Sequence, residues 1–263
     1  MAGSMLKPLI WQDLPFGELL QAEIEAKLAP WWPRIFGYHL LKAGALSRQL
    51  NSLHCSIARH FSVYDGVDAS IQADPHHLPV QQSAIDAVLS CFLLEFESDP
   101  YQILREFDRV LISSGYIFIV GFNPISPAFI GKILPKYQTQ LPWNGQFFMP
   151  SRVKDWLGLL GYKVLADERL MYHSLLGHRG VNTPNQPSKP QQAPLWQKSI
   201  ANWLPSTGSV YLIVARKMTT PLTPIKDKSK VKAPNWSTAP SAGRNGLTHT
   251  PSIETQTLNR SKS

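Results

Sequence analysis

The chain has 263 residues, of which 43% are apolar and 17% charged, enough for one or two domains with a sizeable core. Its two cysteines, Cys55 and Cys91, lie far apart without metal-ligand spacing, and no His, Cys or carboxylate recurs at metal-ligand spacing from His76 and His77. These residues predict reduced cytoplasmic thiols and no metal site. No apolar run approaches the length of a membrane span, and the N-terminus lacks the apolar core of a signal peptide.

The net charge of +8 is concentrated near the C-terminus. Residues 216–263 contain nine lysines and arginines and two acids, whereas residues 1–215 contain seventeen and sixteen. After Lys217 the apolar periodicity stops and Pro, Ser, Thr, Lys and Asn dominate, so residues 218–263 are predicted to be a disordered basic tail. Such a tail either binds a polyanion such as RNA or serves solubility alone.

The N-terminal residues 1–37 are expected to form a helical and aromatic cap. Asp13 and Pro15 start a predicted helix that ends near Pro30, and several aromatic residues follow it. This segment either covers a ligand site or packs as a helix and aromatic cluster against the edge of a sheet.

The middle of the chain predicts alternating strands and helices. Residues 85–94 are almost unbroken apolar, as in a strand buried on both faces. Asp99-Pro100 then opens a helix, and residues 116–120 form the next strand, which together make a parallel, right-handed unit. The other predicted strands are at 38–43, 56–64, 69–73, 162–165 and 209–215, with residues 167–172 as a candidate continuation of the fourth of these. A turn and helix are predicted at 44–50 and a helix at 150–160. The pattern predicts an α/β fold.

The sequence of residues 72–123 resembles the class I S-adenosylmethionine-dependent methyltransferases, in particular the type 11 methyltransferase group. Asp74 is followed in order by Leu-Pro, Ile-Asp-Ala-Val-Leu-Ser, Leu-Glu-Phe, Asp-Pro, Leu-Arg-Glu, Arg-Val-Leu and a Gly before a strand. The resemblance implies a Rossmann-like, seven-stranded, mostly parallel sheet with helices on both faces over residues 38–217. It also implies that the last strand is antiparallel and lies beside the fifth.

The resemblance implies an enzyme that transfers a methyl group from S-adenosylmethionine to an acceptor. The chain has no Asn-Pro-Pro-Tyr-type motif of amino-methylating enzymes and no cysteine pair for chemistry at base C5. A small-molecule acceptor is therefore favoured over nucleic acid.

The resemblance also implies where the cofactor is held. The expected contacts are Gly44, Ala45, Asp65, Asp74, Pro75 and Cys91. Gly44 belongs to the glycine-rich loop, Asp65 is the candidate for the ribose hydroxyls, and Asp74 is placed to accept a hydrogen bond from the adenine amino group. As an isolated loop acid, Asp65 is more typical of a solvated turn, and the alternative for Asp74 is a turn or a helix cap.

The glycine-rich loop departs from the family pattern. Lys42 stands where the family has an acid that holds the methionine ammonium, and Leu46 replaces a glycine. A lysine within about 4 Å of either cationic group of the cofactor would cost up to about 4 kcal/mol at an effective dielectric near 20. Lys42 therefore turns to solvent, pairs with an acid, or weakens cofactor binding. This loop favours the alternative of an inactive scaffold that binds RNA or a protein partner through the basic tail.

Glu95 is the candidate catalytic residue. It follows the strand at 85–94, where the family often has a polar side chain near the transferred methyl group. Glu95 is expected to act as a base or a substrate clamp, or to be a solvated loop residue. The long connection at 127–148 suits a lid over the substrate.

Overall fold

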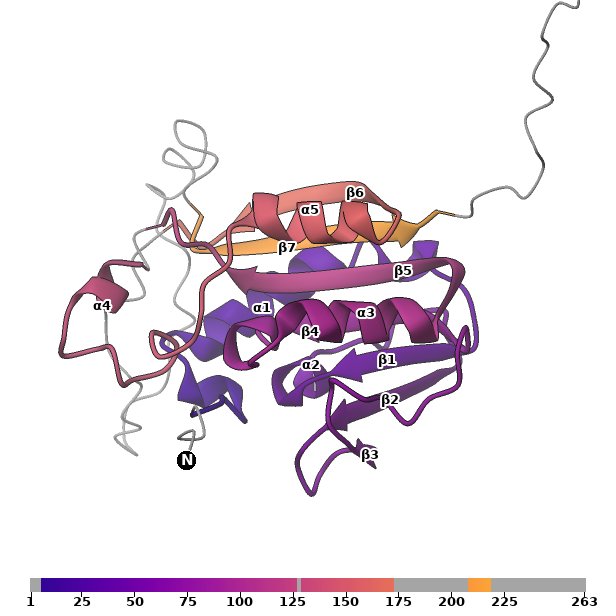
Figure 1. Cartoon of the computed structure of the whole chain (residues 1–263), viewed down its shortest axis with the longest axis horizontal. Helices are drawn as coiled ribbons and strands as arrows, with labels where there is room; N and C mark the ends of the chain where they lie inside the picture. The colour runs from indigo at the N-terminus through magenta and orange to yellow at the C-terminus, as the bar shows by residue number, and fades with distance from the viewer. Residues whose placement is uncertain (1–5, 127–128, 173–207, 219–263) are drawn as a thin grey trace, which may run out of the picture. The chain divides into compact units, whose positions relative to one another are not determined.

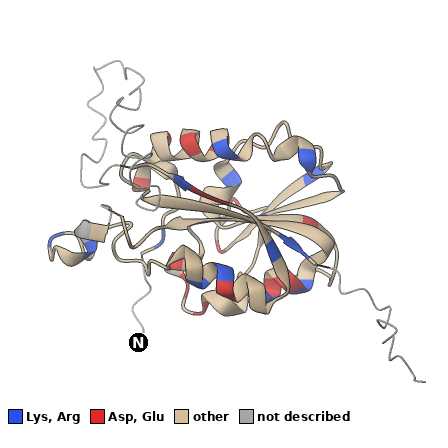
Figure 2. Ribbon diagram, turned by 90° about the horizontal axis from the view of Figure 1, so that it is seen from above, with Lys and Arg blue, Asp and Glu red and all other residues tan. Residues whose placement is uncertain are grey.

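The computed structural model describes residues 6–126, 129–172 and 208–218, which form a twisted sheet of seven strands with helices on both faces (Figure 1 and Figure 2). The strand order is β3-β2-β1-β4-β5-β7-β6. The first five strands are parallel, and β7 is antiparallel to both of its neighbours. The predicted fold class and the place of the last strand beside the fifth are confirmed. The predicted basic tail lies, from residue 219 onward, outside the described residues.

The elements have the following bounds. The strands are β1 His39–Ala43, β2 Arg59–Tyr64, β3 Ile71–Gln72, β4 Ile85–Cys91, β5 Leu111–Phe122, β6 Tyr162–Leu170 and β7 Val210–Lys217. The helices are α1 Gly17–Leu28, α2 Ala45–Gln49, α3 Pro100–Val110, α4 Ile130–Ile133 and α5 Pro150–Leu159. Three short 3-10 turns are η1 Trp11–Asp13, η2 Trp32–Arg34 and η3 Leu94–Phe96.

Several predicted strand boundaries were wrong, including the end of β4 and the start of β5. The strand predicted to reach residue 94 ends at Cys91, because Phe92 has a positive φ of 49° that turns the chain into η3. The strand predicted to start at Tyr116 already begins at Leu111, which pairs with Ile85 of β4. Local composition hides both changes, since the first depends on the backbone conformation of Phe92 and the second on pairing with β4.

The sheet separates two apolar cores. Successive residues of β1 point to opposite faces, so Leu40 packs with α1, whereas Leu41 packs with α3. On the second face, α3 begins where Asp99 Oδ1 accepts a hydrogen bond from the Gln102 amide at 3.0 Å. The face of α3 toward the sheet buries Ile103, Leu104, Phe107 and Val110. The amphipathic pattern read from the sequence therefore fixes which side of α3 faces the sheet.

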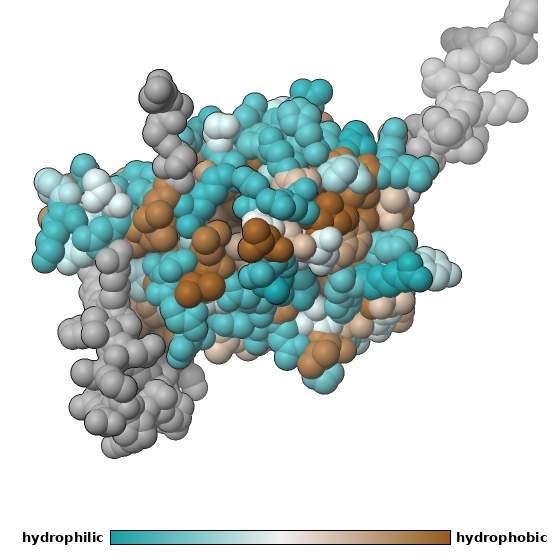
Figure 3. Space-filling view, turned by 90° about the horizontal axis from the view of Figure 1, so that it is seen from below, coloured by the Kyte–Doolittle hydropathy of each residue, from teal (hydrophilic) through white to brown (hydrophobic). Residues whose placement is uncertain are grey.

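The end of the sheet that carries β2 and β3 is thinly covered. Among the described residues, the connections on either side of β3 contain no helix. Seen from below, apolar side chains interrupt the hydrophilic surface of the molecule (Figure 3). An open hollow of about 320 Å³ is lined by His39, Phe61, Ile71, Pro79, Val80, Gln81, Ala84 and Ile85. His39 and Ile85 begin their strands, so this hollow is not at the carboxyl ends where α/β sheets bind ligands.

Candidate functional site

The carboxyl ends of the parallel strands meet at one edge, on the left in Figure 1. Ala43 at the end of β1 pairs with Ser90, and Cys91 at the end of β4 pairs with Val120. The segments that follow β1, β4 and β5 therefore begin side by side, as expected for the ligand edge of such a sheet. The N-terminal segment and the segment that carries α4 lie at the same edge (Figure 1).

The turn after β1 is held by main-chain contacts. Gly44 has a φ of +91°, a conformation that favours glycine, and its amide donates to the Val63 carbonyl at 3.0 Å. Ser47 Oγ donates to the Ala43 carbonyl at 2.6 Å and accepts from the Cys91 amide at 2.8 Å. These bonds tie the start of α2 to both β1 and β4, with Ala45 half-buried between them.

Leu46, which stands where the resembled family has a glycine, is a core residue. Its side chain is buried on the α1 face of the sheet. A glycine there would leave part of that core unfilled, so the leucine of this loop has a packing function.

The Lys42 side chain is buried and turned into the protein. Its ammonium donates to the Leu50 carbonyl, just after α2, at 2.7 Å. Burial lowers the pKa of Lys42, and the neighbouring Cys91, Cys55 and Glu25 oppose that shift. Lys42 shares a face of β1 with Leu40, so its charge lies on the α1 side of the sheet.

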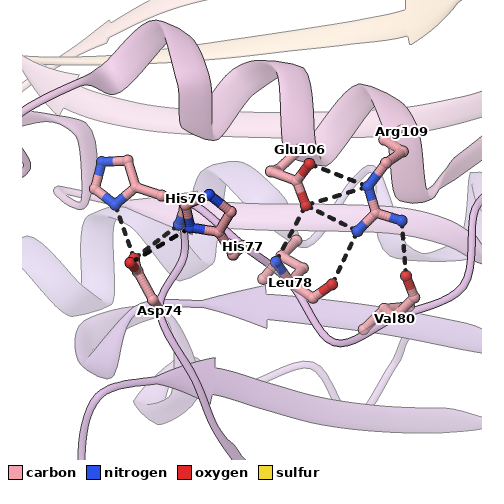
Figure 4. A network of polar contacts seen from close by, with 7 residues as sticks. All are labelled: Asp74, His76, His77, Leu78, Val80, Glu106 and Arg109. Carbon is pink, nitrogen blue, oxygen red and sulfur yellow. Dashed lines mark hydrogen bonds and ion pairs between the residues drawn. The ribbon is translucent and has the colours of Figure 1, made fainter.

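The two carboxylates expected to hold the nucleoside lie on the surface. Asp65 is exposed directly after β2. Asp74 follows β3, and its side chain is 58% exposed. Its Oδ1 accepts from the His76 amide at 2.9 Å and lies 2.8 Å from His76 Nδ1 (Figure 4). The hydrogen bond donated by the His76 backbone amide is the main reason that the pKa of Asp74 is lowered. Asp74 thus shapes a turn, beside the buried Pro75, and remains accessible.

A polar network fixes the loop between β3 and β4 to α3 (Figure 4). Arg109 donates to the Leu78 carbonyl at 2.8 Å and to the Val80 carbonyl at 2.9 Å. Glu106 accepts from the Leu78 amide at 3.1 Å and from Arg109 Nε at 3.0 Å. The Arg109 guanidinium holds the pKa of Glu106 below its usual range. Sequence reasoning used this Arg-Val-Leu stretch for the resemblance but gave Arg109 no role. Its spacing of three residues from Glu106 on a helix was the available signal.

Replacing Arg109 by alanine is expected to lower the free energy of unfolding by about 2 kcal/mol, because two backbone carbonyls lose their donor. Urea unfolding measures the change. Arg105→Ala is the matched control, since Arg105 is exposed on the same helix and should cost far less. Equal losses in the two variants would show that the network does not hold the loop.

Glu95, the candidate base, is buried in η3 and only 1% exposed. Its Oε1 accepts from the Phe122 amide at 2.9 Å. Burial raises the pKa of Glu95 to about 8. An ideal Cβ on Gly121 would lie 2.4 Å from Glu95 Oε1 and 2.3 Å from the Tyr211 hydroxyl, so both oxygens pack against this glycine. Within the described chain, Glu95 Oε2 and the Tyr211 hydroxyl have no hydrogen-bond partner.

The structure therefore places Glu95 in the interior, and its role as a base stays a prediction. Tyr211 was missed by sequence reasoning, because a single tyrosine in the apolar run of β7 carries no distinguishing signal. Cys91 is likewise interior, 1% exposed, and burial raises the pKa of its thiol. Its backbone amide, bonded to Ser47, is the part that contributes to the edge.

The N-terminal segment crosses the carboxyl edge of the sheet. Lys7 pairs with Glu97 at 2.6 Å, and the Leu9 carbonyl accepts from Gln49 Nε2 at 2.7 Å. The Leu6 carbonyl accepts from Asn144 Nδ2 at 2.7 Å. These contacts link the segment to three parts of the edge: the turn after η3, the end of α2 and the connection that follows α4.

An aromatic column fills the space below these segments. Trp11 is buried and meets Phe92 edge-on, with ring centroids 6.0 Å apart. Phe92 stacks on Phe122 at 4.1 Å, and Phe122 stacks on Phe147 at 5.1 Å. The column joins the tips of β4 and β5 to both covering segments.

Comparisons with known proteins agree with this geometry. A family model described as a methyltransferase domain matches residues 49–119. The uncharacterized protein YafS of Escherichia coli (strain K12) is 36% identical over 221 residues, which cover 84% of this chain and 85% of that protein.

Solved structures share the fold at low sequence identity. A proposed S-adenosylmethionine-dependent methyltransferase from Listeria monocytogenes superimposes with a TM-score of 0.54 at 13% identity, covering 77% of this chain and 100% of that one. An S-adenosylmethionine-dependent methyltransferase from Archaeoglobus fulgidus gives a TM-score of 0.51 at 16% identity, over 75% of this chain and 94% of that one.

Proposed function

The chain belongs to the class I S-adenosylmethionine-dependent methyltransferase family, and we propose that it methylates a small-molecule acceptor at the carboxyl edge of its sheet. One observation favours a small-molecule acceptor over a nucleic acid or a protein. The N-terminal segment and the connection after α4 both cover that edge and are joined by the hydrogen bond between Leu6 and Asn144. A small molecule needs only a local opening to enter, whereas a folded nucleic acid or protein needs both segments to move apart.

The residues at the edge fit the nucleoside half of the cofactor. In the proposal, Asp65 holds the ribose hydroxyls and the accessible carboxylate of Asp74 accepts from the adenine amino group. The turn at Gly44 and Ala45 brings main chain close to the cofactor, and Pro75 and the Cys91 backbone border it. When bound, S-adenosylmethionine supplies an electrophilic methyl group, so positioning of the acceptor is the main task of the chain.

The residues fit the methionine half less well. No carboxylate follows β1, and the Lys42 ammonium is held by the Leu50 carbonyl. We therefore give Lys42 no contact with the cofactor and expect the methionine end to be held by backbone groups of the Gly44 turn. Trp11, Phe92 and Phe122 exclude water from the same region. In-line transfer needs a base only for acceptors that lose a proton, and Glu95 is proposed for that case alone.

Replacing Asp74 by alanine is expected to weaken the binding of S-adenosylhomocysteine roughly tenfold to a hundredfold, the scale for a charge-assisted hydrogen bond. Isothermal titration calorimetry measures the dissociation constant. Asp155→Ala removes an exposed carboxylate of α5 and should leave the affinity unchanged. Unchanged affinity in folded Asp74→Ala would remove Asp74 from the site. If the unaltered protein binds neither S-adenosylmethionine nor its demethylated product at millimolar concentration, the scaffold alternative replaces the proposal.

A further inference from the structure

The connection between β5 and α5 combines apolar side chains with positive charge. From residue 109 to residue 154 the sequence contains no Asp or Glu, while Lys132 and Lys136 lie in this connection. Figure 2 shows basic residues on the projecting α4 region and no acidic residue there. Apolar side chains with lysines and without acids are the composition of segments that lie on anionic lipid surfaces.

The structure anchors one part of this connection and leaves another part outside. Trp143 is buried and meets Tyr137 with ring centroids 5.0 Å apart. Lys132 donates to the Gly145 carbonyl. By contrast, Ile133 is 65% exposed and Leu134 is 41% exposed, on a helix end that projects from the body (Figure 1). The exposed Ile133 and Leu134 therefore lie in a connection whose other residues are fixed to the protein body.

The N-terminal segment adds a second row of exposed apolar side chains at the same edge. Leu6 and Leu9 are both 58% exposed, and Ile10 is 47% exposed. The Leu6 carbonyl is bonded to Asn144, next to the Gly145 that holds Lys132. The acids in contact with this row are occupied, since Glu97 pairs with Lys7 and Asp13 accepts from the Leu9 and Ile10 amides. The two rows are thus tied to neighbouring residues of one connection, Asn144 and Gly145.

We propose that this edge surface, made of Leu6, Leu9, Ile10, Ile133, Leu134 and Lys136, docks the protein on an anionic lipid bilayer. Exposed aliphatic side chains on a projecting segment suit insertion among acyl chains, whereas RNA recognition relies on stacking and phosphate contacts. Lys136 lies beside them and is exposed, so it can meet anionic headgroups. The inference rests on the proposed function, because docking would turn the acceptor edge toward the bilayer and its amphiphilic molecules.

Co-sedimentation of the full chain with vesicles of phosphatidylglycerol and phosphatidylcholine tests the proposal. The double variant Ile133→Ser with Leu134→Ser is expected to lower the vesicle partition coefficient at least about tenfold. Lys136→Glu changes two charges and should lower it by about twenty-five-fold at low salt, since each charge near the surface contributes about fivefold. Pure phosphatidylcholine vesicles should bind the unaltered protein more weakly than the mixed vesicles.

The matched control is Leu159→Ser with Leu165→Ser, whose side chains are 77% and 41% exposed on α5 and β6. This control should bind vesicles like the unaltered protein. The proposal is overturned if the edge variants bind vesicles as tightly as the control, because any lipid binding would then belong to the basic tail. It is also overturned if the unaltered protein binds an RNA oligonucleotide but not the vesicles. Calorimetry with S-adenosylhomocysteine on the unaltered protein and on the same variants keeps the two proposals apart. Absence of cofactor binding by the unaltered protein would contradict the proposed function, whereas the edge variants should bind the cofactor like the unaltered protein and lose only vesicle binding.

Discussion

Replacing Gly121 by alanine is expected to lower the free energy of unfolding by at least about 3 kcal/mol. The new methyl group would lie 2.3 Å from the Tyr211 hydroxyl and 2.4 Å from Glu95 Oε1. Both side chains are buried, so neither can move aside without disturbing the core between β5 and β7. Moving Glu95 would also break its bond to the Phe122 amide. Urea unfolding followed by circular dichroism measures the loss.

Gly158→Ala provides the matched control. Gly158 lies in α5, and no atom comes within 4 Å of the position that its Cβ would occupy. Alanine there should stabilise the protein by up to about 1 kcal/mol, because it is the better helix former. If Gly121→Ala is as stable as Gly158→Ala, the close packing of Glu95 and Tyr211 on β5 is wrong.

Replacing Glu95 by glutamine is expected to stabilise the protein by about 4 kcal/mol at pH 8 and to have little effect at pH 5. Burial raises the pKa of Glu95 from 4.5 to about 8. Between these two pH values the folded protein keeps a proton that the unfolded chain releases, so the stability of the unaltered protein falls as pH rises through this window. At roughly 1.4 kcal/mol for each pH unit, the fall reaches about 4 kcal/mol or more.

Glutamine has no charge to desolvate, and its carbonyl oxygen can still accept from the Phe122 amide. Urea unfolding of both proteins at pH 5, 7 and 8.5 measures the difference. Glu97→Gln is the control, because it removes the ion pair with Lys7 and should give no gain at high pH. A less stable Glu95→Gln at pH 8 would mean that the carboxylate is charged and held by a partner.

Much of this fold was open to prediction from the sequence. The apolar run of β4, the Asp-Pro start of α3 and the periodicity of its buried face are local signals, and they define the parallel unit at the centre of the sheet. The end of β4, by contrast, has no local signal in the sequence. It depends on the left-handed turn at Phe92, and a phenylalanine gives no sequence signal for that conformation.

For the candidate site, the sequence predicted which strand each residue follows but not whether its side chain is buried. The sequence placed Gly44, Asp65, Asp74 and Glu95 after the correct strands, because strand ends are visible in the apolar pattern. The alternation does not reveal that Glu95 points inward while Asp74 stays exposed, since the following segments decide burial. Lys42 is a similar case. Its partner, the Leu50 carbonyl, is fixed by the path of α2 rather than by any residue type.

The position of β7 has a consequence for the synthesis of the protein. β7 is the last described strand in the chain, yet it separates β5 from β6 and is the strand with which β6 pairs. While the ribosome extends the chain beyond Leu170, the outer edge of β5 has no neighbour and β6 has no place in the sheet. At about 5–20 residues per second, this interval lasts several seconds. An unpaired strand edge invites pairing between nascent chains, so newly made molecules should depend on chaperones until residues 210–217 emerge.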